Sequence, residues 1–355
     1  MTNPERIDVH HHLVPPAFVD AMDRRGIRRV AGAPLPKWEP QASIDTMDAN
    51  GIATALLSLS APGVHFGDDA EACDLARRCN EFAAETASRH RGRLGFFAVL
   101  PMPLVAEACE EATYAIDGLG ADGVVLLGST GGIFLGDPRF DELMAELDRR
   151  RAVVFVHPNL HATSTTIGLE MPGFLIEFLC DTTRAALNLI LSGTMEKYPA
   201  IRFILAHAGG FLPYVAWRVS LANMMPPFDS RAPEGVLAYL RRFYFDTALS
   251  PSRISMAALK ELVDPSHILF GSDFPFAPAR VVAMETKTLD ESGFWEPATR
   301  IGIDRGHALA LFPRYRREGE GVTPAPVPQA MGFQGQLRRA LAGPVVSLLE
   351  QLRNR

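Results

Sequence analysis

Short apolar runs alternate with longer amphipathic segments along most of this 355-residue chain. Apolar runs of this length are typical of strands that are buried on both faces of a parallel sheet. They predict eight strands, at Arg6–His10, Thr54–Ser60, Leu94–Pro101, Gly123–Gly128, Val153–His157, Phe203–His207, Phe243–Thr247 and Ile268–Asp273. Helical periodicity between them is clearest at Ser43–Asn50, Asp69–His90, Val105–Leu119 and Phe140–Arg150. The alternation predicts an α/β protein built from repeated βα units.

Two α/β architectures fit this pattern, a closed (β/α)8 TIM barrel and an open doubly wound sheet. The placement of polar residues separates them, because His10, His157, His207 and Asp273 each stand at the C-terminal end of a predicted strand. A barrel brings all of these ends to one mouth, whereas an open sheet keeps its first and last strands apart. We therefore expect a closed TIM barrel with its active site at that mouth.

The composition changes after Tyr315, which predicts a boundary near residue 316. Residues 1–316 would form the barrel. Residues 317–334 are rich in Gly, Pro, Glu and Gln and are interpreted as a linker. Residues 335–355 carry Leu and Val at three- and four-residue spacing, which predicts a C-terminal amphipathic helical tail. Packing on the barrel or on another subunit is the favoured role of the tail, and binding to a membrane surface is the alternative.

Charge and composition narrow the class of partner. The net charge of −6 argues against nucleic acid or an anionic membrane as the main partner, and favours a small molecule. The N-terminus lacks a cationic segment followed by a long apolar one, and no apolar run approaches the length of a membrane span. The four cysteines have no zinc-knuckle spacing and are too few for a disulfide scaffold. These features predict a protein of the reducing cytoplasm that binds a small molecule.

The first candidate site is the His10-His11-His12 run. In an extended strand, positions 10 and 12 point to one side and position 11 points away, so His10 and His12 can share a metal ion. A tag remnant or a solvated terminus is the alternative. It is disfavoured because the run continues the apolar stretch Ile7–Val9 and because further polar residues stand at later strand ends.

Three later strand ends add candidate residues. His157 leaves a buried strand just before Pro158, and His207 precedes two glycines that would let the backbone approach a ligand closely. A hydrogen-bonded core position is the alternative for each of these histidines. Asp273 follows an apolar strand, and a buried carboxylate there needs a cation or a cluster of hydrogen bonds. A metal ion would supply the cation.

Together, the motifs HxH, VHP, HAGG and GSDFPF at these positions resemble the amidohydrolase superfamily, a metal-dependent hydrolase type of TIM barrel. They are most similar to amidohydrolase family 2, in the branch of aminocarboxymuconate-semialdehyde decarboxylase. The resemblance covers about residues 6 to 315. The stretches Trp38–Gly63 and Phe245–Ser250 are also similar, more weakly, to 6-methylsalicylate decarboxylases.

The resemblance implies that His10, His12, His157 and Asp273 bind one divalent metal ion, usually zinc and sometimes manganese. It implies that His207 is a catalytic acid or base that does not bind the ion. Arg218 matches an arginine that reaches the substrate carboxylate of a neighbouring subunit, which would make the enzyme a homodimer; a surface arginine is the alternative.

The leading hypothesis is nonoxidative decarboxylation of an aromatic or unsaturated carboxylic acid, of the 6-methylsalicylate or aminocarboxymuconate-semialdehyde type. Either Asp273 carries the proton, or a metal-bound water deprotonated by His207 adds first, and the sequence leaves both routes open. Hydrolysis of a lactone or amide, or hydration, at the same site is the alternative reaction. A metal-binding protein without activity is a third hypothesis, disfavoured because every ligand and the base are present.

Other histidines receive structural interpretations. We expect His11 to face away from the metal site and His267 to be solvated. His65 and His161 follow predicted strand ends, where either could line the pocket.

Overall fold

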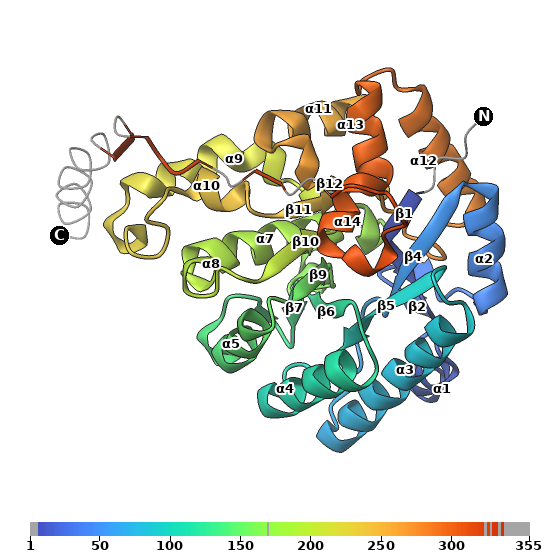
Figure 1. The fold of residues 1–355 in the computed structure, drawn as a ribbon. Helices are drawn as coiled ribbons and strands as arrows, with labels where there is room; N and C mark the ends of the chain where they lie inside the picture. The colour runs from blue at the N-terminus through green and yellow to red at the C-terminus, as the bar shows by residue number, and fades with distance from the viewer. Residues whose placement is uncertain (1–5, 169, 323–324, 327–328, 333–334, 337–355) are drawn as a thin grey trace.

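The computed structural model describes residues 6–168, 170–322, 325–326, 329–332 and 335–336. Eight parallel strands lie side by side in the order in which they occur in the chain (Figure 1). They are β1 (Arg6–His12), β4 (Ile52–Ser58), β5 (Leu94–Val99), β6 (Gly123–Leu127), β9 (Val153–His157), β10 (Arg202–Leu205), β11 (Tyr244–Asp246) and β12 (Ile268–Leu269). All eight predicted strands are therefore present.

Backbone hydrogen bonds between β1 and the segment leaving β12 close the sheet. The Val9 N–H donates to Phe270 O at 3.0 Å, and the His12 N–H donates to Phe274 O at 2.7 Å. Between them, the Asp273 N–H donates to His10 O at 2.7 Å. An open sheet has no such contact between its first and last strands, so the prediction of a closed TIM barrel is confirmed.

Helices follow each barrel strand and pack around the outside of the barrel (Figure 1). These are α2 (Pro40–Ala49), α3 (Asp69–Arg89), α4 (Val105–Thr113), α5 (Asp141–Arg149), α7 (Glu177–Leu191), α9 (Leu212–Ser220), α11 (Arg253–Leu262) and α12 (Ala279–Glu291). The additional helices are α1 (Pro16–Arg24), α6 (Ser164–Ile167), α8 (Thr194–Lys197), α10 (Val236–Leu240), α13 (Pro297–Ile301) and α14 (His307–Leu311). Two short hairpins, β2 (Arg29–Val30) with β3 (Ala33–Pro34) and β7 (Ser129–Thr130) with β8 (Ile133–Phe134), lie outside the barrel sheet.

Helix α3 illustrates how the sequence sets a helix boundary. The Asp68 carboxylate accepts the Glu71 N–H at 2.8 Å and so satisfies one of the free donors of the first turn. Asp69 and Glu71 place negative charge at the positive end of the helix dipole, and Arg89 places positive charge in the last turn. The helix ends at Arg89, one residue before the predicted end.

Two strands end earlier than predicted because of their backbone geometry. His207 has a φ of 56° and Asp273 a φ of 57°, in the left-handed region that strands do not use. Strands β10 and β12 therefore stop before these residues, each of which lies in the turn beyond its strand. Non-glycine residues in this region are uncommon and cluster at functional sites, which makes His207 and Asp273 candidate site residues on backbone geometry alone.

The segment after the barrel follows a partly extended path. Its described residues from 316 to 332 include no helix or strand, and Arg305 ties its start to the barrel by donating to Glu320 Oε1 at 2.8 Å. The predicted helical tail lies outside the described residues from position 337 onward, so the linker and tail boundaries stay predictions. None of the helices in the described residues is long and apolar enough for a membrane span.

Candidate metal centre and active site

Four side chains from three parts of the barrel meet at its mouth. His10 and His12 come from β1, His157 ends β9, and Asp273 follows β12. One potential ligand atom from each lies within 4.8 Å of all the others. The Nε2 atoms of His10 and His12 are 3.0 Å apart, and Asp273 Oδ1 is 3.3 Å and 3.0 Å from them, respectively. The barrel thus brings together the four residues that the family resemblance implies as ligands.

The donor chemistry of this cluster fits a divalent cation. All four residues are buried, and three imidazoles with one carboxylate form a donor set that zinc and neighbouring transition metals accept. Burial lowers the pKa of His12, and burial with the nearby histidines lowers the pKa of His157 well below its ordinary value. Both imidazoles are therefore neutral near pH 7, with a nitrogen lone pair available for an ion.

His10 differs from the other two ligands. Burial lowers its pKa, but the carboxylates of Asp246 and Asp273 raise the pKa more strongly, to about 10. In the absence of an ion, the carboxylates of Asp246 and Asp273 therefore stabilise a proton on His10. Burial raises the pKa of Asp273, but the charge of His10 and the nearby His12 ring lower it more strongly, to well below its ordinary value.

The second nitrogen of each histidine ligand is held by the protein. The Nδ1 atom of His10 lies 2.7 Å from Asp246 Oδ2, that of His12 lies 3.0 Å from Ser58 O, and that of His157 lies 2.8 Å from Pro158 O. Such contacts fix the tautomer and the ring orientation. They leave the Nε2 atom of each ring to face the centre.

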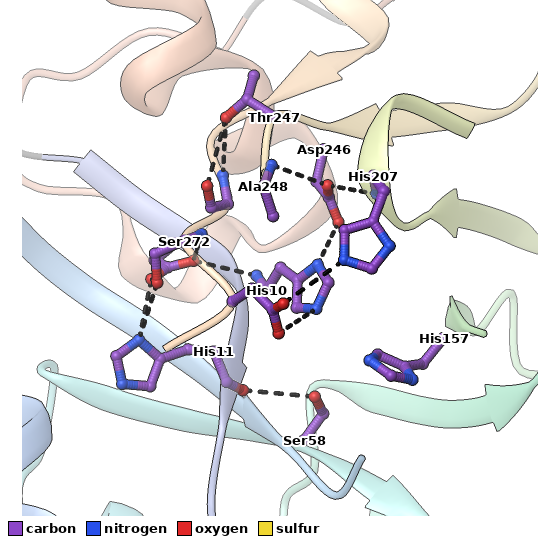
Figure 2. Close-up of polar contacts among 12 residues, drawn as sticks. His10, His11, Ser58, His157, His207, Asp246, Thr247, Ala248 and Ser272 are labelled. Carbon is purple, nitrogen blue, oxygen red and sulfur yellow. Dashed lines mark hydrogen bonds and ion pairs between the residues drawn. The ribbon is translucent and has the colours of Figure 1, made fainter. Parts of the chain in front are cut away.

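Asp246 supports the site although it was not among the predicted site residues. Its Oδ1 accepts the backbone N–H of His207 at 2.9 Å and of Ala248 at 3.1 Å, while Oδ2 contacts His10 (Figure 2). It therefore orients a metal ligand and positions the turn that carries His207. The signal was available, because Asp246 is a carboxylate near the end of an apolar predicted strand, as Asp273 is.

His207 lies beside the four ligands, and its Nε2 is 3.6 Å from Asp273 Oδ2. The side chain is 5% exposed, and neither ring nitrogen has a hydrogen-bond partner among the described residues. A buried imidazole without partners is unfavourable unless a ligand or water completes its hydrogen bonds. His207 is thus free to interact with a molecule bound at the centre.

His11 faces away from the centre, as predicted. Its Nδ1 lies 2.9 Å from Asp8 Oδ2, and its Nε2 lies 2.9 Å from Ser43 Oγ. Asp8 also accepts from Ser272 Oγ at 2.5 Å, so this second polar cluster links β1 to the segment after β12 (Figure 2). It holds the closure of the barrel and leaves His11 no role at the ion.

Two sequence-based interpretations are wrong. The glycines after His207 approach protein rather than ligand, since a Cβ on Gly209 would lie 2.6 Å from the Phe245 ring and one on Gly210 would lie 2.4 Å from Leu179 O. They permit close packing of the turn. His267 is buried rather than solvated, because its ring stacks on Tyr244 and its Nδ1 lies 2.9 Å from Phe243 O.

Arg218 does not reach the metal centre of its own chain. It lies on the exposed side of α9, near Tyr214 and Trp217, which are 88% and 74% exposed. The cavity at the centre does not include it.

A cavity of about 460 Å³ opens beside His157, His207 and Asp273. Its other walls are mainly apolar, with Phe174, Leu175, Phe178, Leu179, Leu249, Phe276 and Val281 among them. An apolar cavity with polar groups at one end fits a small ligand that has an apolar body and a polar head. We call it the metal chamber.

Comparison with known proteins places this centre in a family. The family model described as amidohydrolase matches residues 7–300. The chain belongs to the amidohydrolase family. A 6-methylsalicylic acid decarboxylase of Penicillium expansum is 38% identical to this amidohydrolase over 88% of this chain and 97% of the relative.

Solved structures agree with this assignment. An amidohydrolase II crystal structure has a TM-score of 0.82 and 31% identity, covering 87% of this chain and 100% of its own. A dihydroxybenzoic acid decarboxylase from Polaromonas sp. JS666, with bound manganese and 2-nitroresorcinol, has a TM-score of 0.76 and 25% identity, covering 88% of this chain and 98% of its own. The family resemblance read from the motifs is confirmed. The expectation of a decarboxylase is also confirmed, and the hydrolase or hydratase alternative is not favoured.

Proposed function

We propose that this amidohydrolase removes the carboxyl group of a 2-hydroxybenzoate that carries an apolar substituent, with 6-methylsalicylate as its first candidate substrate. The observation that carries the proposal is the pairing of a buried four-ligand centre with an apolar chamber. The similarity to 6-methylsalicylic acid decarboxylase over most of both chains supports the same substrate class.

His10, His12, His157 and Asp273 would hold one divalent ion, which supplies a Lewis acid for the carboxylate and the adjacent hydroxyl of the substrate. The three imidazoles favour zinc, whereas manganese is the ion in the Polaromonas relative. We propose zinc as the resident ion. Elemental analysis of protein purified without chelators, followed by activity measurements after reloading with each metal, tests this choice.

Apolar side chains would hold the aromatic ring. Phe178 and Phe276 line the metal chamber from two sides, and Leu249 projects into it from a turn where its own φ is 51°. These walls would hold the ring by apolar contact and leave the carboxylate and the hydroxyl at the polar end, beside the ion. The polar end of the chamber then determines which end of the substrate reacts.

The reaction needs one proton at the carbon that bears the carboxylate. That carbon gains a C–H bond, its bond to the carboxyl carbon breaks, and carbon dioxide leaves while the bonding electrons stay with the ring. Asp273 would deliver the proton, and His207, 3.6 Å from Asp273 Oδ2, would hold the proton near that carboxylate. Each proton consumed in turnover would be replaced from solvent.

We further propose that the enzyme acts as a homodimer in the cytoplasm. The exposed Tyr214 and Trp217 on α9 provide an apolar face beside Arg218, and large exposed aromatics of this kind are enriched at protein interfaces. In a dimer built on this face, Arg218 would contact the substrate carboxylate of the partner. Sedimentation of wild type and W217E, together with the KM of R218A, tests both points: wild type should be dimeric and W217E monomeric.

Carbon dioxide release from 6-methylsalicylate by the metal-loaded protein tests the main proposal, with 3-methylphenol as the expected product. 2,6-Dihydroxybenzoate serves as the comparison substrate. Its turnover should be slower, because its second hydroxyl would meet apolar walls. Turnover of lactones with no carbon dioxide from any hydroxybenzoate would overturn the proposal.

A further inference from the structure

A second cavity of about 470 Å³ lies beside the metal chamber and contains no metal ligand. It covers the ends of β4, β5 and β6 and the loop after β4, with Leu59, Val64, Leu100 and Leu127 among its apolar walls. We call it the side chamber. The compact substrate proposed above does not need this space.

The two chambers share a partition. Val30 and Phe178 line both of them. The Phe178 ring packs edge-on against the ring of the ligand His157, with their centroids 5.8 Å apart. The side chamber therefore begins next to the metal centre, and a group that passes the partition would start close to the reacting carboxylate.

Three polar side chains that line the side chamber, those of Arg29, His65 and Asn159, make hydrogen bonds within the protein. The Arg29 guanidinium donates to Gly32 O at 2.9 Å, and His65 Nε2 lies 2.9 Å from Asp69 Oδ1. Asn159 donates to Ser129 O at 2.9 Å and accepts the Leu160 N–H at 2.9 Å. The other walls are largely apolar, so a ligand that extends along Leu59, Leu100 and Leu127 would meet mainly apolar surface.

Resting on the proposed function, we infer that the side chamber receives an unbranched alkyl chain at carbon 6 of the salicylate ring. The 2-hydroxyl and the carboxylate would face the ion, so carbon 6 is the free ring position nearest the carboxylate. A chain attached there would begin where the partition meets His157. The substrate class is therefore 6-alkylsalicylates with chains longer than methyl, and 6-methylsalicylate is its shortest member.

A chain-length series tests the inference on metal-loaded protein, with 6-methyl-, 6-ethyl-, 6-propyl- and 6-pentylsalicylate as substrates. We expect kcat/KM to rise about fourfold for each methylene that becomes buried, which corresponds to about 0.8 kcal/mol. A flat or falling series with measurable turnover of 6-methylsalicylate would overturn the side-chamber inference and leave the proposed function standing.

A matched pair of variants locates the chain. L127W places an indole in the side chamber, and L179W makes the same change at a wall of the metal chamber only. L127W should abolish the preference for pentyl over methyl, whereas L179W should lower kcat/KM for both substrates and keep their ratio. An unchanged ratio in L127W would place the chain elsewhere and refute the inference.

Binding measurements separate the two proposals. The Kd of each salicylate, measured by calorimetry on the metal-loaded and slowly reacting H207A variant, should fall with chain length and should stay constant when L127W is added. If no salicylate is decarboxylated but this dependence on length is found, the side chamber stands and the proposed reaction falls. If neither turnover nor the dependence is found, both fail.

Discussion

The two ends of strand β1 carry buried polar groups that differ in how completely the protein satisfies them. At the start of the strand, Arg6 is 2% exposed and donates to Asp304 at 2.9 Å, to Asp290 at 2.6 Å and to Asn50 O at 2.7 Å. Arg300 donates to the same two carboxylates. The two arginines balance the two carboxylates in charge, and among the described residues only Arg300 Nε of this cluster lacks a hydrogen-bond partner.

At the other end of the strand, the balance is incomplete. His10 and His12 direct nitrogen atoms at each other and at Asp273, and His207 has no hydrogen-bond partner among the described residues. A TIM barrel places its chemistry at this end of the strands and uses the opposite end for stability. The start of β1 thus carries a polar cluster that stabilises the fold. Its C-terminal end carries a polar cluster whose interactions a bound ligand would complete.

The largest expected effect on activity comes from substitutions at the metal end of β1. H12A should lose the metal ion and with it all measurable activity, because it removes one of four ligands. H207A should retain the ion and lower kcat/KM by about 10²- to 10⁴-fold, the usual contribution of a general acid or base. Elemental analysis and carbon dioxide release measure the two effects. Equal loss of metal in both variants would show that His207 is a ligand and not an acid or base.

A substitution at the start of β1 should lower the stability of the fold and leave activity unchanged. R6M leaves the buried Asp304 without one of its partners, and removing one member of a buried ion pair typically destabilises by about 3–5 kcal/mol. Because Asp290 is 45% exposed and Asp304 keeps Arg300, we expect the lower end of that range. Urea unfolding measures the loss, and kcat of the folded fraction should match wild type. A reduced kcat at unchanged stability would show that Arg6 supports catalysis rather than the fold.

A smaller effect is expected at the residue that supports the centre. D246N can still accept the His207 and Ala248 N–H groups, but it removes the negative charge that contacts His10 Nδ1. Loss of such a support typically lowers metal affinity by about 10- to 100-fold. Competition with a chelator measures the affinity. S43A, which removes a contact of the outward-facing His11, is the control and should leave the affinity unchanged.

Glu285 offers the smallest and the only stabilising change. It is 6% exposed, and both of its carboxyl oxygens lack a hydrogen-bond partner among the described residues. Burial, followed by the charge of Asp273, raises the pKa of Glu285 to about 9. Because this folded-state pKa lies above the unfolded value, the folded protein binds the extra proton, and its stability falls as pH rises from about 4.5 to about 9.

E285Q removes this dependence. Above pH 4.5, the destabilisation by Glu285 grows by about 1.4 kcal/mol for each pH unit, so E285Q should stabilise the protein by about 1–2 kcal/mol at pH 6. The gain should vanish near pH 4.5. Thermal or urea unfolding at several pH values measures it. A gain that does not change with pH would mean that Glu285 is ionised in the folded protein.

Much of this could be predicted from the sequence, because the decisive signals are local. Strand runs are short and apolar, and His157 and Asp273 mark strand ends by their contrast with the residues before them. His10 and His12 follow from the two-residue period of a strand. The candidate residues therefore follow from local patterns, whereas the separation of four ligands from His207 depends on the family resemblance.

Other features depend on contacts between distant residues and carry no local signal. Arg6 pairs with Asp304, 298 positions away, and nothing near Arg6 in the sequence identifies that partner. The burial of His267 depends on packing against Tyr244, and the partition by Phe178 depends on how α7 lies over the barrel. Asp246 is an intermediate case. Its position near a strand end can be seen in the sequence, but its contacts with His10 and with the His207 N–H cannot.

The hydrogen bond from the Asp273 N–H to His10 O couples closure of the barrel to metal binding. It closes the barrel and also places a metal ligand, so the ion site lies across the junction between the first and last strands. An ion bound there stabilises only the closed state and suppresses its local opening. Amide hydrogen exchange at Val9 and His12 should therefore slow on metal loading, whereas the amides paired between β5 and β6 should exchange as before.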